Sequence, residues 1–226
     1  MENLADYELW EKYPKYHKWF NKLYIAELMS YRCGPSGTAP KLSDYYIVRP
    51  IYNLAGMGIG ASLQWIEAGD KSAVPPGYFW CEYLSGFHYS ATYTFKHGGV
   101  SSSKPYWEPL HCWIGYNNTN NLTKFTRWER STSYIPEVPR EFNELSGLII
   151  NIEFKGQNPI EVHLRGSGNP DGSLDSDYNE YIPVWASDFV DIDSYISKGY
   201  SYITDDEDMS DVYPYTSERR LGFLVK

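Results

Sequence analysis

Residues 152–165 read IEFKGQNPIEVHLR. Two strand-like runs flank a Gly-Gln-Asn segment, which is typical of a turn, so the stretch predicts a β-hairpin. Residues two apart on a strand share a face, and Glu161, His163 and Arg165 are therefore expected to point the same way. If the turn closes the hairpin, Glu153 faces the same side. Two carboxylates then lie beside an imidazole and a guanidinium.

This charged hairpin has two interpretations. Buried carboxylates need a counter-charge, and Mg²⁺ held by one or two carboxylates and by substrate phosphates supplies it. Arg165 would then neutralise a transferring phosphoryl group. The other interpretation is a surface hairpin with alternating charges, and the hairpin taken alone favours neither.

A second segment, YIVRPIYNLAGMGIGA at 46–61, places a cation and three glycines directly after a strand-like run. An ordinary turn is the simplest interpretation. The glycines also satisfy the G-x-G-x-x-A pattern of dinucleotide-binding proteins, which needs a strand-to-helix turn, but Pro50 and the short SLQWIEAGDK segment fit that helix poorly. The third interpretation is a flexible loop between two antiparallel strands that closes over nucleotide phosphates, with Arg49 beneath it as a phosphate partner.

The rest of the chain predicts an α+β protein rich in strands. Its 226 residues include 22 Tyr and 8 Trp, and aromatic residues favour strands. The apolar periodicity predicts a helix over 6–31 with a break near Pro14, and further helices over 137–145 and 178–196. Strands are expected at 45–48, 61–66, 78–84, 88–96, 110–116, 148–155, 159–165 and 221–225.

Charge and composition exclude several classes of protein. The net charge of −9 without a Lys/Arg cluster argues against nucleic-acid binding. Three cysteines without a C-x-x-C pair argue against a disulfide framework or a structural zinc and indicate a reducing cytoplasm. No apolar run approaches the ~20 residues of a membrane helix, and the N-terminus lacks the apolar region of a signal peptide. We therefore expect a cytoplasmic protein with neither nucleic acid nor membrane as partner. The short, tyrosine-rich build suggests a viral gene, whose product would act in the host cytoplasm.

Four segments together resemble the ATP-grasp ligases, over about residues 20–225. Asn21-Lys22, at the head of KLYIAELMSYRCGP, is similar to the Asp-Lys that opens the family's first helix. IVRPIYNLAGMGIGA resembles its strand, basic residue, proline and glycine loop, with Arg49 where the family usually has Lys. FWCEYLSGFHYSATYTF resembles the hinge that lines adenine, and the hairpin at 151–165 resembles the metal-binding hairpin.

The resemblance implies an α+β, ATP-grasp-like fold, in which two antiparallel-sheet subdomains with flanking helices enclose a nucleotide cleft. A helical extension would occupy residues 1–20. The ATP-grasp-like domain would follow at 21–226, with a small lobe at about 40–80 and a large lobe at about 81–226.

The resemblance also implies roles for the matching residues, with ATP and Mg²⁺ or Mn²⁺ as cofactors. Glu153, Glu161 and His163 match metal ligands, although the family usually has Asn at the third position and imidazole suits softer metals than Mg²⁺. Arg165 and Arg49 would take part in catalysis by neutralising phosphoryl charge. The nucleotide would be bound by Lys22, Arg49, Asn53, Gly56, Gly58, Glu82, Tyr83, Leu84 and His88.

The implied function is ATP-dependent ligation of a small-molecule or peptide carboxylate, through an acylphosphate that an amine or another nucleophile attacks. Family members usually carry a further domain before the lysine helix, whereas only residues 1–21 precede Lys22 here. The acceptor site would then be remodelled, supplied by a second copy or a partner subunit, or lost. A catalytically silent nucleotide-binding or interaction module on the same fold is the alternative, and an NAD-dependent oxidoreductase is a third hypothesis.

Overall fold

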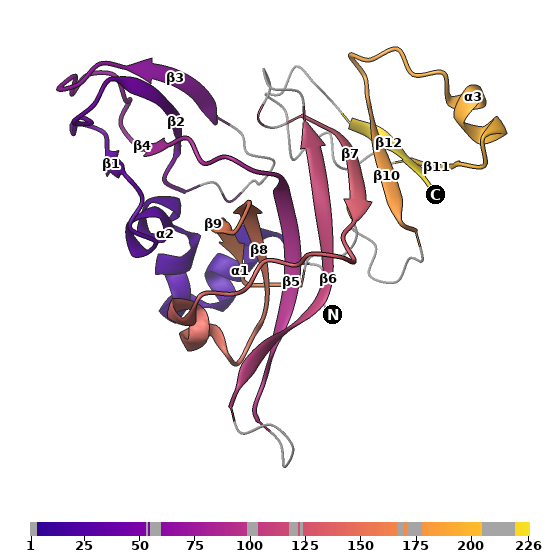
Figure 1. Cartoon of the computed structure of the whole chain (residues 1–226), viewed down its shortest axis with the longest axis horizontal. Helices are drawn as coiled ribbons and strands as arrows, with labels where there is room; N and C mark the ends of the chain where they lie inside the picture. Colours follow the sequence, from indigo (N-terminus) through magenta and orange to yellow (C-terminus); the bar gives the residue numbers. More distant parts are fainter. Residues whose placement is uncertain are drawn as a thin grey trace.

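The computed structural model describes residues 4–52, 54, 60–98, 104–117, 122, 124–166, 170, 178–204 and 220–226. Their strands form two sheets in which every neighbouring pair is antiparallel, and helices lie beside both (Figure 1). The small sheet has the order β1–β4–β2–β3, with β1 at Cys33–Pro35, β2 at Asp44–Pro50, β3 at Ser62–Ile66 and β4 at Tyr78–Glu82. The α+β architecture with two antiparallel sheets is the one that the family resemblance implies.

The large sheet has the order β11–β12–β10–β7–β6–β5–β8–β9. Its strands are β5 at His88–Lys96, β6 at Tyr106–Asn117, β7 at Phe125–Arg130, β8 at Ile149–Lys155, β9 at Asn158–His163, β10 at Glu180–Trp185, β11 at Ser201–Thr204 and β12 at Arg220–Val225. The β8–β9 hairpin therefore forms one edge of this sheet, next to the helices (Figure 1).

The glycine-rich segment joins two antiparallel strands. Val48 of β2 pairs with Ser62 of β3, and Tyr45 pairs with Trp65 further along the same hairpin. Because a strand follows the glycines at Ser62–Ile66, the strand-to-helix turn of a dinucleotide-binding fold is not present, and that interpretation is wrong. Asn53, Gly56 and Gly58, which the sequence places in the phosphate loop, lie outside the described residues.

The predicted helix over 6–31 is three short helices: α1 at Asp6–Lys12, a 3₁₀ helix η1 at Pro14–Phe20, and α2 at Lys22–Leu28. Pro14 starts η1, since proline is tolerated in a first turn and not in a helix interior. The second break has a capping residue: the Oδ1 of Asn21 accepts a hydrogen bond from the backbone N–H of Tyr24 at 2.9 Å. This cap makes Lys22 the first residue of α2.

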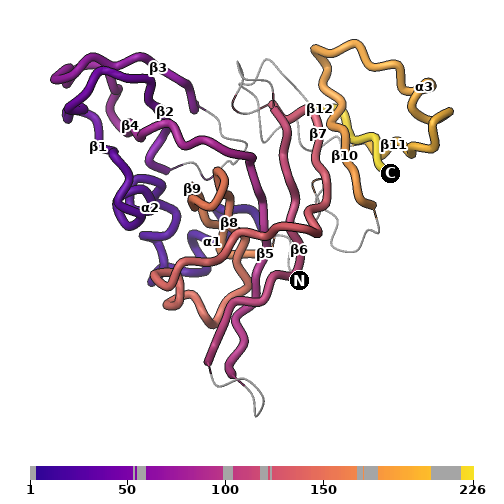
Figure 2. The backbone as a smooth tube through the Cα atoms, viewed as in Figure 1, coloured from indigo at the N-terminus to yellow at the C-terminus, as the bar shows by residue number. Residues whose placement is uncertain are grey.

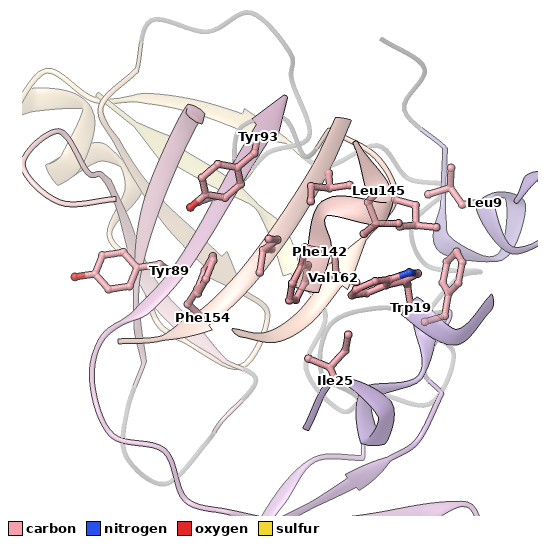
Figure 3. Packing of buried hydrophobic residues seen from close by; sticks show 14 of the residues in the cluster. Leu9, Trp19, Ile25, Tyr89, Tyr93, Phe142, Leu145, Phe154 and Val162 are labelled. Carbon is pink, nitrogen blue, oxygen red and sulfur yellow. The ribbon is translucent and has the colours of Figure 1, made fainter. Parts of the chain in front are cut away.

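The main core lies between these helices and the large sheet. Trp19 of η1 packs against Phe142 of a second 3₁₀ helix, η2 at Arg140–Leu145, with ring centroids 4.8 Å apart. Figure 3 shows Leu9, Trp19 and Ile25 directed from the helices toward Phe142, Leu145 and Val162. The apolar residues of the N-terminal helices are therefore part of the large-sheet core, and this packing fixes where the polar residues of the same helices lie.

Two parts of the sequence-based prediction are wrong. The predicted helix over 178–196 is strand β10 followed by the short helix α3 at Ile192–Ser197. The run Tyr181–Trp185 is rich in aromatic and β-branched residues, which favour strands. It lies between β7 and β12 and pairs with both. This pairing and the burial that comes with it determine the structure, although Trp185 and Phe189 have helical spacing. Strands β1, β7 and β11 are absent from the prediction.

None of the helices in the described part of the chain is long and apolar enough to span a membrane.

The chain passes from the small sheet to the large one through residues 83–87 (Figure 2). This connection touches the β8–β9 turn, because the backbone N–H of Gly156 donates a hydrogen bond to the carbonyl of Phe87 at 2.8 Å. Gly86 has a φ of +115°, and a Cβ there would lie 2.8 Å from the nitrogen of Gly156. The inter-sheet connection is thus attached directly to the charged hairpin.

We expect Gly86→Ala to lower the free energy of unfolding by about 1–3 kcal/mol, because an alanine is strained at this positive φ and its Cβ would clash with the backbone of Gly156. Urea denaturation followed by circular dichroism measures the change. Gly147→Ala is the control: its Cβ would meet nothing within 4 Å, so a shift below about 0.5 kcal/mol is expected. Equal shifts in the two variants would contradict the tight contact at Gly86.

Candidate functional site

The β8–β9 hairpin brings its two acidic residues face to face. Glu153 and Glu161 are direct cross-strand partners. Ligand atoms of Glu153, Glu161 and His163 all lie within 4.8 Å of one another. The Nε2 of His163 is 3.8 Å from an oxygen of each glutamate. The structure therefore places the three predicted metal-ligating residues in one cluster.

Two cations reach this hairpin from distant parts of the chain. The Nζ of Lys22 lies 2.7 Å from the carboxylate of Glu161, and the two side chains are only 6% and 12% exposed. Arg49, on β2 of the small sheet, donates from Nη2 to the carbonyl oxygen of Ile160 at 2.9 Å. The guanidinium of Arg49 also lies over the ring of Phe79, and its buried Nε has no hydrogen-bond partner among the described residues. The small sheet and α2 thus both present a cation to the acidic edge of the large sheet.

His88 lies on the other side of Glu153. Its Nε2 is 3.6 Å from the Glu153 carboxylate, and its ring packs edge-on against Phe125 and Trp128. Burial lowers the pKa of His88 to about 4, which outweighs the attraction of Glu153, so this imidazole is neutral near pH 7. The buried Nε2 has no hydrogen-bond partner in the described part of the chain.

Asp6 is a member of the cluster that the sequence did not indicate. It lies on α1 and is 6% exposed, and its Oδ2 accepts a hydrogen bond from Nδ1 of His163 at 2.8 Å. The Nε of Arg165, two residues beyond the end of β9, is 3.5 Å from Oδ1 of Asp6. No periodicity or motif marks an aspartate near a chain end as the partner of a histidine so far along the sequence. Only the packing of α1 against the large sheet brings the two together.

The charges of the cluster fix one another's protonation. Burial opposes the charged form of His163, but the carboxylates of Asp6, Glu153 and Glu161 prevail and raise the pKa of His163 to about 10. Burial likewise opposes the charged form of Glu153, and the nearby imidazoles and Lys22 hold its pKa well below the usual range. The pKa of Asp6 is lowered in the same way, since His163 and Arg165 outweigh its burial.

These residues fit a divalent cation. Two carboxylates are the ligands that hard cations prefer, and the imidazole adds a nitrogen ligand suited to softer metals. Because His163 is protonated in this arrangement, a cation that binds its Nε2 must release a proton. The buried Nε of Arg49, unpaired among the described residues, is a donor free for a further ligand.

The residues predicted to line adenine lie in the connection between the sheets. Glu82 accepts hydrogen bonds from the backbone N–H and the Nε of Arg32, at 2.8 and 3.0 Å, so its carboxylate is tied to the small sheet. Tyr83 is 54% exposed and lines an open hollow of about 370 Å³ beside Arg32. Leu84 is half-buried.

Comparisons with known proteins agree with this architecture. No protein-family model matches the chain, and no curated protein matches its sequence. Solved structures do match in fold. An L-amino acid ligase from Bacillus licheniformis is 11% identical with a TM-score of 0.54, over 93% of this chain and 67% of that one.

Two further solved structures contain ADP. N5-carboxyaminoimidazole synthetase from Staphylococcus aureus in complex with ADP is 11% identical with a TM-score of 0.52, over 94% of this chain and 68% of that one. The ADP complex of an N5-carboxyaminoimidazole ribonucleotide synthetase is 9% identical with a TM-score of 0.53, over 100% of this chain and 74% of that one. The chain thus spans about two thirds to three quarters of the length of these proteins. At such low identity the match concerns the fold, and it shows that this chain has the fold of the ATP-grasp ligases.

Proposed function

We propose that the chain binds ATP and a divalent cation between its two sheets and ligates a carboxylate to an amine or another nucleophile. The observation that carries this proposal is the convergence of Lys22 from α2 and Arg49 from β2 on the β8–β9 hairpin that carries the paired glutamates: Lys22 contacts Glu161, and Arg49 contacts the neighbouring carbonyl of Ile160. Cations and carboxylates gathered from separate elements are what a phosphate–metal complex requires. Two solved proteins of the same fold are ADP complexes, which supports a nucleotide as the ligand.

In the proposed reaction, an oxygen of the substrate carboxylate attacks the γ-phosphorus of ATP and the bond to ADP breaks. The amine then attacks the acyl carbon of the acylphosphate, and phosphate leaves with the bonding electrons. Phosphoryl transfer depends on positioning and on charge neutralisation more than on covalent help from the protein. Lys22, Arg49 and Arg165 would supply positive charge at the phosphates. A bound cation, held by Glu153, Glu161 and His163, would add further positive charge at the phosphates.

The remaining assignments complete this proposal. Glu82, Tyr83, Leu84 and His88 would face the base and ribose. The loop 53–60, with Asn53, Gly56 and Gly58, would close over the phosphates. A small lobe at about 40–80 and a large lobe at about 81–226 would enclose the nucleotide. The segment 1–20 would precede them, and the protein would act in the cytoplasm as a homo-oligomer or with a partner subunit.

Two measurements test the proposal. Isothermal titration calorimetry with ATP and Mg²⁺ should show metal-dependent binding. Release of ADP and phosphate should then rise when free amino acids are added, which are the first choice of substrate because a protein of this fold is an L-amino acid ligase. If ATP does not bind in the presence of any divalent cation, the proposed function is rejected.

The second candidate, a catalytically silent module, is favoured by one observation. The positive charges of Lys22, His163 and Arg165 balance the three carboxylates of Asp6, Glu153 and Glu161 without a metal ion. Such a module would bind nucleotide, or nothing, and release no ADP with any carboxylate. The amino-acid-dependent release of ADP therefore separates the two candidates.

Arg49→Ala should weaken ATP binding by about 10–100-fold and leave adenosine binding unchanged, because a charge-assisted hydrogen bond contributes about 1.5–3 kcal/mol and only ATP carries phosphates. Competition titrations with both ligands measure the two affinities. Arg130→Ala is the matched control, since this guanidinium also lies over an aromatic ring, that of Trp113, on a strand of the large sheet. Equal losses for ATP and adenosine would show that Arg49 only holds the structure together.

A further inference from the structure

Asp6 fixes the orientation of the His163 ring. Its Oδ2 accepts a hydrogen bond from Nδ1 of His163 at 2.8 Å, so the second nitrogen of the ring points away from Asp6. That nitrogen, Nε2, lies 3.8 Å from oxygens of both Glu153 and Glu161. Both Asp6 and His163 are buried, at 6% and 8% exposure, which leaves the ring little freedom to turn.

This arrangement is the one that proteins use to orient a metal-binding histidine. A ligating imidazole almost always donates its other N–H to a carboxylate or carbonyl, which sets the tautomer and the direction of the ring. Two ligands of one ion, each about 2.1 Å from it, lie at most about 4.2 Å apart. Ligand atoms within 4.8 Å of one another, with Nε2 at 3.8 Å from both carboxylates, need only a small inward movement of the side chains to hold an ion.

Asp6 is itself held firmly. The Nε of Arg165 lies 3.5 Å from its other oxygen. Leu9, one turn along α1, is 2% exposed in the main core. The N-terminal helix therefore presents the Asp6 carboxylate at a fixed place behind the hairpin.

We propose that Asp6 is a positioning residue that makes His163 the third ligand of the cation site, and that this site prefers Mn²⁺ or Co²⁺ to Mg²⁺. The inference rests on the proposed function, because it assigns the metal of the same site. An imidazole nitrogen adds affinity for first-row transition metals and little for Mg²⁺, which favours oxygen ligands and water. The N-terminal helix would then complete the site.

The test measures metal binding and requires no turnover. The unchanged protein, labelled with ¹⁵N-histidine, is titrated with Mn²⁺ alone and with Mg²⁺ alone, and the Mn²⁺ form is examined by electron spin-echo spectroscopy for coupling to ¹⁵N. We expect Mn²⁺ to bind at least about 10-fold tighter than Mg²⁺, with ¹⁵N coupling present. Asp6→Asn should weaken Mn²⁺ by about 10–100-fold while Mg²⁺ changes little, once the affinities are corrected for the proton that His163 releases on binding, which the pH dependence of each affinity gives. Asp188→Asn is the control, since Asp188 is also paired with a cation, Lys124, and is not part of the cluster.

His163→Asn keeps the test decisive if Asp6→Asn fails to fold. This variant should lose the ¹⁵N coupling and the preference for Mn²⁺. Coupling that persists in His163→Asn would identify His88, 3.6 Å from Glu153, as the ligand and would overturn the inference. An Asp6 that only fastens α1 would change the melting temperature and leave the coupling and the Mn²⁺ to Mg²⁺ ratio unchanged.

The two failures are distinguishable. If neither Mn²⁺ nor Mg²⁺ binds the unchanged protein, with or without ATP, the proposed function fails together with the inference. If Mg²⁺-dependent ATP binding is present but no ¹⁵N coupling is seen, only the inference fails.

Discussion

Glu161→Gln should reduce the affinity for ATP with Mg²⁺ to the value that the unchanged protein shows in EDTA. Glu161 is one of the two carboxylates of the hairpin, and glutamine offers a cation one neutral oxygen in place of a charged group. Loss of a residue behind a metal ligand already costs 10–100-fold in metal affinity, so loss of the ligand should cost more than about 100-fold. Calorimetric titration of ATP, with Mg²⁺ and with EDTA, measures both values.

The control for this variant is Glu108→Gln, which makes the same change of charge at a glutamate of β6 whose side chain is 42% exposed. It should bind ATP with Mg²⁺ as the unchanged protein does. Glu161→Gln should retain the weak, metal-free binding of ATP, because Lys22 is then released from its ion pair and is available to phosphate. A Glu161→Gln protein that is folded and still gains affinity when Mg²⁺ is added would rule out the hairpin as the metal site.

The local geometry of the site follows from the sequence. Alternation along a strand sets which side chains share a face, and a short turn sets which residues lie opposite each other. Both rules are local, and they predict the hairpin and its shared face. The pairing of Glu153 with Glu161 also depends on a register shift between Glu153 and Phe154, since Phe154 pairs with Pro159 and Lys155 with Asn158, and the alternation does not indicate this irregularity. The pairing of β2 with β3 is predictable for the same reason, since the strand pattern and the turn residues are adjacent in the chain.

The approach of distant elements does not follow from such rules. Spacing alone says nothing about whether Lys22 or Arg49 approaches a hairpin more than a hundred residues away, and here only the family resemblance indicated it. Asp6 shows the limit most clearly. The resemblance covers no residue before about position 20, and α1 reaches the site only because Leu9 and its neighbours are buried in the large-sheet core.

The error over residues 178–196 has a different origin. Trp185 and Phe189 have helical spacing, but Phe189 is fully exposed and Trp185 is buried in a strand. The segment forms a strand because it pairs with β7 on one side and with β12 on the other. Both partners are distant in the chain, so the local spacing of apolar residues does not indicate this pairing. The same holds for β7, whose charged FTRWER segment does not resemble a core strand.

Lys22→Met and Glu161→Gln should each lower the free energy of unfolding by about 3 kcal/mol or more, and the double variant should recover most of that loss. A buried ion pair contributes little net stability, but removing one partner leaves the other charge buried without compensation. Urea denaturation of the four proteins gives the coupling energy of the pair, which is the sum of the two single losses minus the loss in the double variant and should therefore exceed about 3 kcal/mol.

The exposed pair of Lys96 and Glu108 provides the comparison. It joins neighbouring strands of the same sheet at 3.2 Å, yet its side chains are 48% and 42% exposed, so solvent screening should hold its coupling below about 1 kcal/mol. Equal coupling in the two pairs would mean that Lys22 and Glu161 are hydrated, contrary to their burial. The double variant also separates structure from function, because it restores the fold without either charge. If it is stable and no longer binds ATP, the two charges are kept for the ligand, since the fold does not need them.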